Sequence, residues 1–104
     1  MTDRAAKAPE DCTTMAEVRA GVDALDAELV ALLARRFAYM RAAARIKESR
    51  EAVRDEARKA RVIAAAVAAA EARGLPGDVI AEIWERLVEG SIAYEFAEWD
   101  RIRG

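Results

Sequence analysis

The fold is decided by residues 15–49, which read MAEVRAGVDALDAELVALLARRFAYMRAAARIKES. The stretch has no proline, and its only glycine is Gly21. Apolar side chains recur in it at steps of three and four, the spacing of one face of an α-helix. They are Met15, Val18, Val22, Leu25, Leu29 and Leu32. At 1.5 Å per residue, about 35 helical residues make a rod of roughly 50 Å.

A rod of this length is too long to be covered by its own chain. A compact domain of about 100 residues has a radius of gyration near 13 Å. We therefore predict an all-α fold with three helices per chain and a very long first helix, assembled as an intertwined homodimer. Arg36 stands where the apolar stripe should continue, and Lys47 follows three turns later. Cations on the buried seam of a dimer indicate a site for an anion.

The start of the chain predicts an arm followed by one domain. Residues 1–13 are expected to form a flexible N-terminal arm, and residues 14–104 a single helical domain. Thr14 and Glu17 have the spacing of a capping box, a hydroxyl at the helix start and a carboxylate three residues later. The first helix is therefore predicted over residues 15–49.

Two shorter helices are predicted in the remainder. Asp55 is expected to cap a helix over residues 56–73, which Gly74 ends because glycine readily takes a positive φ. Another helix is predicted over residues 78–101. Their predicted inner faces consist of Val62, Ile63, Ala66, Val67 and Ala70 for the second helix, and of Ile80, Ile83, Trp84, Leu87, Ser91, Tyr94 and Glu95 for the third.

Composition limits the kinds of chemistry. The chain is 54% hydrophobic and 35% charged and has no histidine, so it offers no histidine-dependent nucleophile and no histidine metal site. We expect a reaction that needs no cofactor or metal, or simple binding. One cysteine, Cys12, cannot form an intrachain disulfide, and no apolar run is long enough to span a bilayer. These features favour a cytoplasmic protein without membrane association.

Positive charge is concentrated in residues 35–61, which hold ten cationic and four acidic side chains. The local excess is six positive charges, whereas the whole chain has a net charge of −2. Such an excess attracts an anionic small molecule or a nucleic acid. The acidic remainder of the chain disfavours a nucleic-acid partner. A basic nucleic-acid-binding module or a non-catalytic helical dimer nevertheless stays an alternative at this point.

The cations of the first helix can be placed on its faces. Arg36 and Lys47 are eleven residues apart, so they fall within about 20° of each other around a helix. Arg19 precedes Arg36 by seventeen residues, about 25 Å along the axis, and faces another way. These two arginines of one chain cannot reach the same small ligand. In an antiparallel pair of helices, however, Arg19 of one chain can approach Arg36 of the other.

Two pairs of polar residues complete the candidates. Ser91 and Glu95 lie one turn apart on the apolar face of the third helix, where a carboxyl group must be paired or protonated. Asp55 and Arg58 lie on the first turn of the second helix, where a cap and its neighbour are the simplest interpretation.

The order of these residues resembles that of the all-α chorismate mutases (the AroQ class). The opening PEDCT of residues 9–13 and the late Trp99 resemble a close branch, the isochorismate pyruvate lyases of salicylate synthesis. The similarity covers about residues 9–102. The matching residues are Val18-Arg19, Asp23-Ala24-Leu25-Asp26, Leu32-Leu33-Ala34-Arg35-Arg36, Lys47, Val53-Arg54-Asp55 and Arg58.

The resemblance implies a cofactor-free pericyclic reaction, the rearrangement of chorismate to prephenate, in active sites shared between two subunits. Cleavage of isochorismate to salicylate and pyruvate is the alternative. Lys59 stands where many mutases have a glutamate for the ring hydroxyl, which disfavours the usual mutase contact, whereas Asp55 is typical of the mutases. The resemblance implies that Arg19 of one subunit and Arg36 and Arg58 of the other bind the carboxylates of the substrate. It implies that Lys47 and Glu95 donate to the ether oxygen. Asp55 would lie near the ring hydroxyl, and Ser91 would line the pocket.

Overall fold

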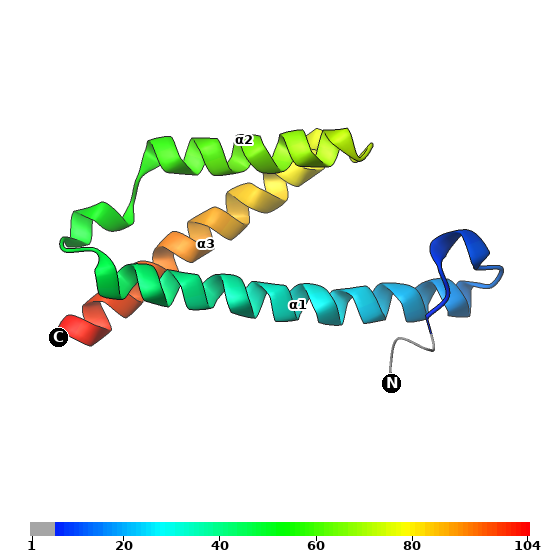
Figure 1. Cartoon of the computed structure of the whole chain (residues 1–104), viewed down its shortest axis with the longest axis horizontal. Coiled ribbons are helices and arrows are strands. Elements are labelled where there is room, and N and C mark those ends of the chain that lie inside the picture. Colours follow the sequence, from blue (N-terminus) through cyan, green and yellow to red (C-terminus); the bar gives the residue numbers. More distant parts are fainter. Residues whose placement is uncertain (1–5) are drawn as a thin grey trace. The chain divides into compact units, whose positions relative to one another are not determined.

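The computed structural model describes residues 6–104, which divide into two compact units between Ala38 and Tyr39. Every regular element in the described residues is helical, and the all-α class with a very long first helix is confirmed (Figure 1). The first five residues of the predicted arm lie outside the described residues. The elements are the 3-10 turns η2 (Pro9–Asp11) and η3 (Arg50–Val53) and the helices α1 (Met15–Ile46), α2 (Glu56–Ala72) and α3 (Gly77–Arg103).

Helix α1 begins with the predicted capping box. The backbone N–H of Glu17 donates to Thr14 Oγ1 at 3.2 Å, and the N–H of Thr14 donates to Glu17 Oε1 at 3.2 Å. Lys7 Nζ lies 2.7 Å from the second carboxylate oxygen of Glu17. This lysine, followed by the backbone N–H of Thr13, lowers the pKa of Glu17 to about 2. The start of α1 is therefore fixed by charge-assisted hydrogen bonds.

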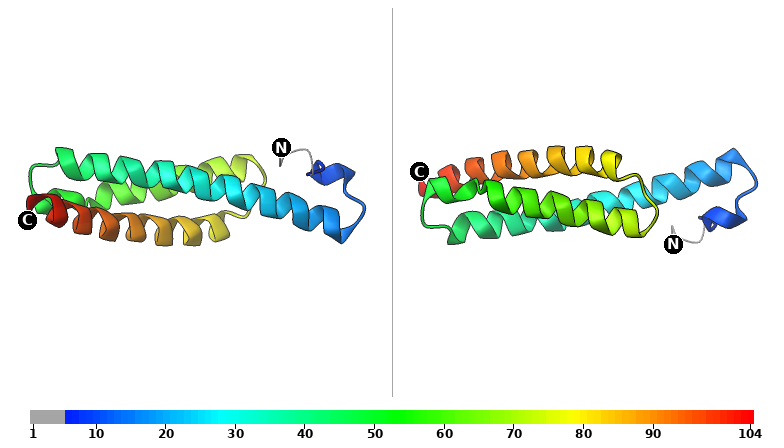
Figure 2. Two further views of the ribbon diagram at one scale, coloured as in Figure 1. Left: turned by 90° about the horizontal axis from the view of Figure 1, so that it is seen from below. Right: turned by 90° about the horizontal axis from the view of Figure 1, so that it is seen from above.

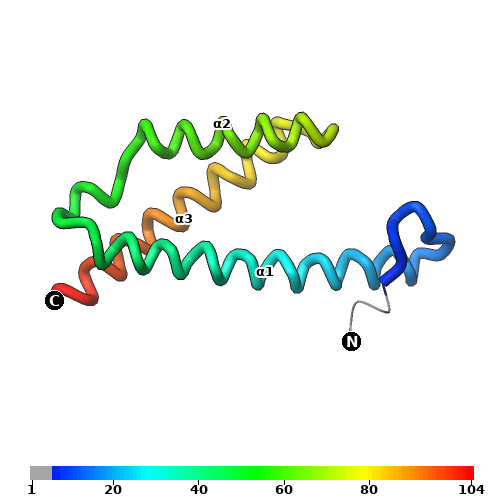
Figure 3. The backbone as a smooth tube through the Cα atoms, viewed as in Figure 1, coloured from blue at the N-terminus to red at the C-terminus, as the bar shows by residue number. Residues whose placement is uncertain are grey.

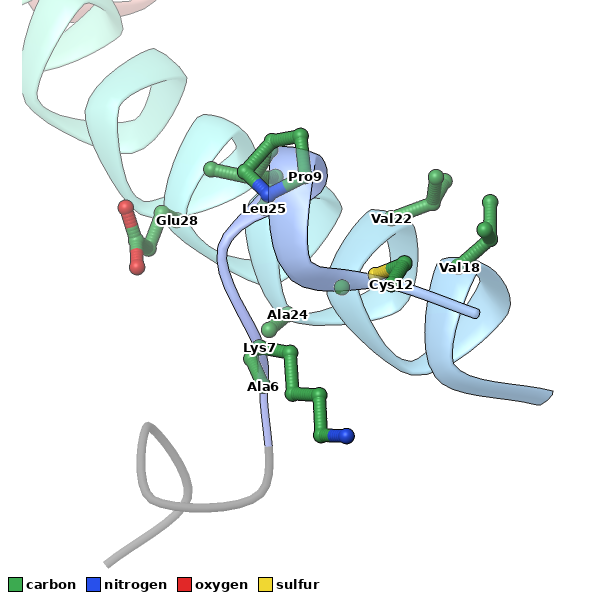
Figure 4. Close-up of a pocket in the computed structure, with 10 residues that line it drawn as sticks. Ala6, Lys7, Pro9, Cys12, Val18, Val22, Ala24, Leu25 and Glu28 are labelled. Carbon is green, nitrogen blue, oxygen red and sulfur yellow. The ribbon is translucent and has the colours of Figure 1, made fainter. Parts of the chain in front are cut away.

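The apolar stripe of α1 is exposed in the single chain. Met15, Leu25 and Leu32 have 57%, 56% and 55% of their surface accessible to solvent. The segment around η2 lies over the first turns of the stripe and leaves an open hollow of about 320 Å³. Figure 4 shows the side chains that line it, among them Pro9 and Cys12 from this segment. Whether the arm is flexible stays a prediction.

The predicted end of the first helix is wrong by three residues. Helix α1 ends at Ile46, and Lys47 follows it rather than lying on its seam. The N–H of Lys47 still donates to the Ala43 carbonyl at 2.9 Å, so the last turn of the helix fixes the position of this residue. At this end, donors from α3, described below, bind the carbonyl groups that a continuation of the helix would use. Figure 3 shows that the backbone leaves the direction of α1 after the end of this helix.

Helices α2 and α3 are in contact and form a hairpin in the second unit, and Figure 1 shows them meeting at the turn after α2 and diverging from it, with a further view in Figure 2. Asp55 caps α2 as predicted, since its Oδ1 accepts a hydrogen bond from the Arg58 N–H at 3.0 Å. Gly74 has a φ of +77°, the left-handed conformation expected of a glycine that ends a helix. The predicted bounds of both helices are correct to within one or two residues.

The core of the second unit joins η3 to α3. It is formed by Val53, Val88 and Ile92, which are 3%, 6% and 8% exposed. The predicted inner face of α2 is confirmed, because Val62, Ile63, Ala66 and Val67 are partly buried and Ala70 is buried. The predicted face of α3 was partly wrong, since it included Ile83, which is 50% exposed, and omitted Val88 and Ile92. The contact with η3, which the periodicity alone does not reveal, rotates the buried face toward these two residues.

No helix in residues 6–104 is both long enough and apolar enough to cross a membrane. The same residues contain no group of three or more cysteine and acidic side chains placed to hold a metal ion.

Candidate functional site

A buried ion pair lies at the centre of the candidate site. Lys47 Nζ is 2.7 Å from Glu95 Oε2, and Glu95 is only 4% exposed. The prediction that Glu95 is buried beside Lys47 is confirmed. Helix α3 presents the carboxylate from its buried face, and the end of α1 supplies the ammonium group. A carboxylate out of water needs such a partner, because its desolvation is costly.

One carboxylate oxygen of this pair keeps unused hydrogen-bonding capacity. Glu95 Oε2 is within ion-pair distance of Lys47, and this buried atom has no hydrogen-bond partner in residues 6–104. Buried polar atoms in folded proteins are nearly always hydrogen-bonded. An oxygen left in this state beside a cation is suited to meet a polar atom of a ligand.

Ser91 lies one turn before Glu95 and is 3% exposed. Its hydroxyl donates to the Leu87 carbonyl at 2.7 Å, a bond to the preceding turn of the same helix. The serine therefore adds a small polar group to the buried face of α3 next to the carboxylate.

The start of α2 is linked to the ion pair through η3. Lys47 Nζ donates to the carbonyl of Val53 at 3.5 Å, and Val53 lies two residues before Asp55. Asp55 is occupied as the cap of α2. Arg58 is exposed, and its guanidinium makes no hydrogen bond or ion pair within the part of the chain that the structure describes. This arginine is thus available to an anionic ligand.

Lys59, next along α2, has a different environment. Its Nζ lies 2.8 Å from a carboxylate oxygen of Glu85 and 2.6 Å from one of Glu89, and these two carboxylates raise its pKa. Arg54 donates to Glu89 at 2.8 and 3.1 Å. Hydrogen bonds from Arg54, and then from Lys59, lower the pKa of Glu89 to about 2. Lys59 is therefore part of a network that ties α2 to α3.

Comparison with known proteins identifies the family. Residues 18–96 match the model of the family described as chorismate mutase type II. The chain belongs to this family. It is also 33% identical over 98 residues to the isochorismate pyruvate lyase of Pseudomonas aeruginosa, a match that covers 94% of this chain and 97% of that protein. The chain is thus an enzyme of the all-α chorismate mutase type, and the predicted resemblance is confirmed.

Two of the predicted site residues of this chorismate mutase type II chain belong to its first unit. Arg19 and Arg36 both lie on α1, which is continuous between them, so they are separated by about 25 Å along the axis. Arg19 is exposed, and Arg36 is partly buried and interacts with other residues of the chain. Lys47, Asp55, Arg58, Ser91 and Glu95 belong to the second unit. The roles of all seven residues stay predictions.

Sequence reasoning missed a set of donors around Lys47. Trp99 Nε1 donates to the Lys47 carbonyl at 3.2 Å, and the Arg103 guanidinium donates to the same carbonyl at 2.9 Å. Arg103 also donates to the carbonyls of Ala44 at 2.9 Å and of Arg45 at 3.4 Å. The sequence signal for this set was the spacing of four residues from Glu95 to Trp99 and from Trp99 to Arg103, which places the three side chains on one face of a helix.

Proposed function

We propose that the chain catalyses the rearrangement of chorismate to prephenate. The observation that carries chemistry at the ether oxygen is the ion pair of Lys47 with the buried Glu95, whose Oε2 has no hydrogen-bond partner in the described residues, and Asp55 favours the mutase reaction. In this pericyclic step the bond between the ether oxygen and the ring carbon breaks while a carbon–carbon bond forms. Negative charge grows on the ether oxygen, and donors placed there lower the barrier. Lys47 and a protonated Glu95 would be these donors.

The remaining roles concern binding of the substrate dianion. Arg58, whose guanidinium is available, would bind one carboxylate together with Arg36, and Arg19 of the partner subunit would bind the other. Bidentate arginine–carboxylate contacts are short, strong and oriented. They would hold the substrate in the compact conformer that reacts, which is the larger part of catalysis in a reaction without a nucleophile or a base. Asp55 would lie near the ring hydroxyl and Ser91 would line the pocket.

A homodimer with shared active sites is part of the proposal. The exposed stripe of α1 supports it, since a face with Val22, Leu25, Leu29 and Leu32 each at least half exposed is unusual for a monomer. The hairpin of α2 and α3 offers an apolar hollow of about 210 Å³, which includes Ala66, Ala70, Ile80 and Trp84 in its lining. The stripe of a second copy would fill such a surface. Light scattering should give twice the 11.4 kDa chain mass, and a folded monomer would contradict this part.

Cleavage of isochorismate to salicylate and pyruvate is the second candidate. The similarity over nearly the full length to an isochorismate pyruvate lyase favours it. So does Lys59, because a lysine held by Glu85 and Glu89 cannot replace the glutamate contact of the mutases. Asp55 favours the mutase.

A non-catalytic or nucleic-acid-binding role has less support. Many of the cations in residues 35–61 have partners within the chain. Arg41 donates to the Tyr94 hydroxyl at 2.8 Å, and Arg50 pairs with Asp100 at 2.8 Å. Lys47, Arg54 and Lys59 are paired with glutamates. Cations engaged in this way do not form a continuous surface for a phosphate backbone.

The test is a comparison of kcat/KM for chorismate and isochorismate with the purified protein. The mutase proposal expects much higher efficiency with chorismate, and the reverse ranking would assign the chain to the lyase reaction. Arg58→Ala should lower either activity by about 100-fold or more, as expected when a charged anchor is lost. Arg61→Ala is the matched control, because Arg61 is an exposed arginine of α2 without a partner in the described residues. Equal effects of the two substitutions would contradict the role of Arg58.

A further inference from the structure

The end of α1 is capped by another helix rather than by its own sequence. An α-helix leaves its last four carbonyl groups without partners inside the helix. A glycine shortly after the last turn is the common solution, but no glycine occurs between Gly21 and Gly74. Instead the Arg103 guanidinium donates to the carbonyls of Ala44, Arg45 and Lys47. A residue of α3 therefore determines where α1 stops.

Trp99 supports this cap in two ways. Its Nε1 donates to the Lys47 carbonyl, the acceptor that Arg103 also uses. The Arg103 guanidinium lies over the Trp99 ring at 4.2 Å from the centroid, a cation–π contact that restricts its orientation. The two side chains thus form one assembly, and the backbone of Lys47 is held by two donors at once.

The same face of α3 holds the other end of Lys47. Glu95, one turn before Trp99, pairs with Lys47 Nζ at 2.7 Å. We propose that Trp99 and Arg103 are positioning residues for Lys47, which fix its backbone so that its ammonium group reaches Glu95 and the reacting oxygen. The role of Lys47 in a reaction rests on the proposed function, whereas the positioning of Lys47 by Trp99 and Arg103 does not.

The kinetic effect should fall on the chemical step. A catalytic group displaced by about 1 Å can cost about 100-fold in rate, because donors to the transition state need accurate placement. Arg103→Ala should therefore lower kcat by about 10- to 100-fold with little change in KM. Trp99→Phe keeps a smaller aromatic ring for stacking and removes the indole N–H, so its loss of kcat should be smaller than that of Arg103→Ala. Arg103→Lys keeps the charge without the planar fork and should rescue only part of kcat.

A second readout does not depend on activity. The chain has three lysines, Lys7, Lys47 and Lys59, and mass spectrometry can follow their acetylation separately. Loss of the cap should free Lys47 from Glu95 and raise its acetylation rate severalfold in Arg103→Ala and Trp99→Phe. Lys59, held by Glu85 and Glu89, should be unchanged and serves as the internal reference.

The matched control is Arg101→Ala. Arg101 is an exposed arginine of the same helix end, and its guanidinium donates to the Glu98 carboxylate. It should alter neither kcat nor the labelling of Lys47. If Arg103→Ala does not fold, Arg103→Lys and Trp99→Phe give the same comparison. Unchanged Lys47 labelling in the cap variants would overturn the proposal. If Lys47 labelling rises in the cap variants while the wild-type protein converts neither chorismate nor isochorismate, the positioning is upheld and the proposed function is refuted.

Discussion

Replacing Lys47 by methionine should destabilise the protein by about 3 kcal/mol. The substitution leaves the Glu95 carboxylate, 4% exposed and without a hydrogen bond to Oε2 in the described residues, without its counter-ion. Removing one partner of a buried ion pair typically costs about 3–5 kcal/mol. Because the Lys47 side chain is 30% exposed, solvent screens part of the attraction, and the lower end of this range applies.

The reciprocal variant should behave differently. In Glu95→Leu the lysine that remains can turn toward solvent, so the cost should stay below about 1 kcal/mol. The double variant Lys47→Met/Glu95→Leu removes both charges and conserves volume, and such replacements are often neutral or stabilising by about 1–4 kcal/mol. The double-mutant cycle should therefore give a coupling energy of at least about 3 kcal/mol. All three variants should have lost most of their activity.

Urea unfolding followed by far-ultraviolet circular dichroism measures these differences. The variants must be compared at one protein concentration, since the stability of a dimer depends on it. With a slope of about 2 kcal/mol per molar urea, the midpoint of Lys47→Met should fall by about 1.5 M. Lys59→Met is the matched control and should cost much less, because the side chains of its partners Glu85 and Glu89 are 51% and 38% exposed, against 5% for Glu95. A double variant less stable than Lys47→Met would refute the reasoning.

Three further predictions concern the shared site, the proton on Glu95 and the acid response. Arg19→Ala and Arg36→Ala should each lose most activity and keep their helicity. When the two variants are unfolded and refolded together, mixed dimers should regain some intact active sites and therefore some activity. No recovery of activity would contradict sites shared between subunits. If a protonated Glu95 donates to the ether oxygen, kcat/KM should fall as the pH rises, and Glu95→Gln should flatten the profile while it keeps substantial activity; a flat wild-type profile with an inactive glutamine variant would contradict this. Because the pKa of Glu89 in the folded chain, about 2, lies below its ordinary value of 4.5, its ion pairs stabilise the fold above about pH 4.5 and are lost as the pH falls through 2. The melting temperatures of wild type and Glu89→Gln should therefore converge in acid, with Glu82→Gln as the control that matches wild type throughout.

Much of the helical architecture could be predicted from local sequence. The capping box at Thr14 and Glu17, the cap at Asp55 and the glycine at Gly74 are short-range signals, and each is present as predicted. The inner face of α2 followed from its periodicity. Burial of Glu95 was predictable for the same reason, because it shares a helix face with Trp84 and Leu87.

The errors arose where a distant segment decides the structure. The end of α1 depends on Arg103, which lies more than fifty residues away, and no local signal marks Ile46 as the last residue. The buried face of α3 depends on the contact of Val88 and Ile92 with Val53. Pairing of Lys59 with Glu85 likewise follows from the packing of α2 on α3.

These long-range contacts also indicate where substrate choice is decided. The two candidate substrates differ in the position of the ring hydroxyl, C4 in chorismate and C2 in isochorismate, and both reactions break the bond to the ether oxygen. Lys47 and Glu95, acting at that oxygen, would therefore serve either reaction equally. Discrimination would then come from groups near the hydroxyl, and under the proposed function these lie at the start of α2, where Asp55 caps the helix and Lys59 is held by α3. A change of specificity should consequently require substitutions in the Lys59 network, while the Lys47–Glu95 pair stays intact.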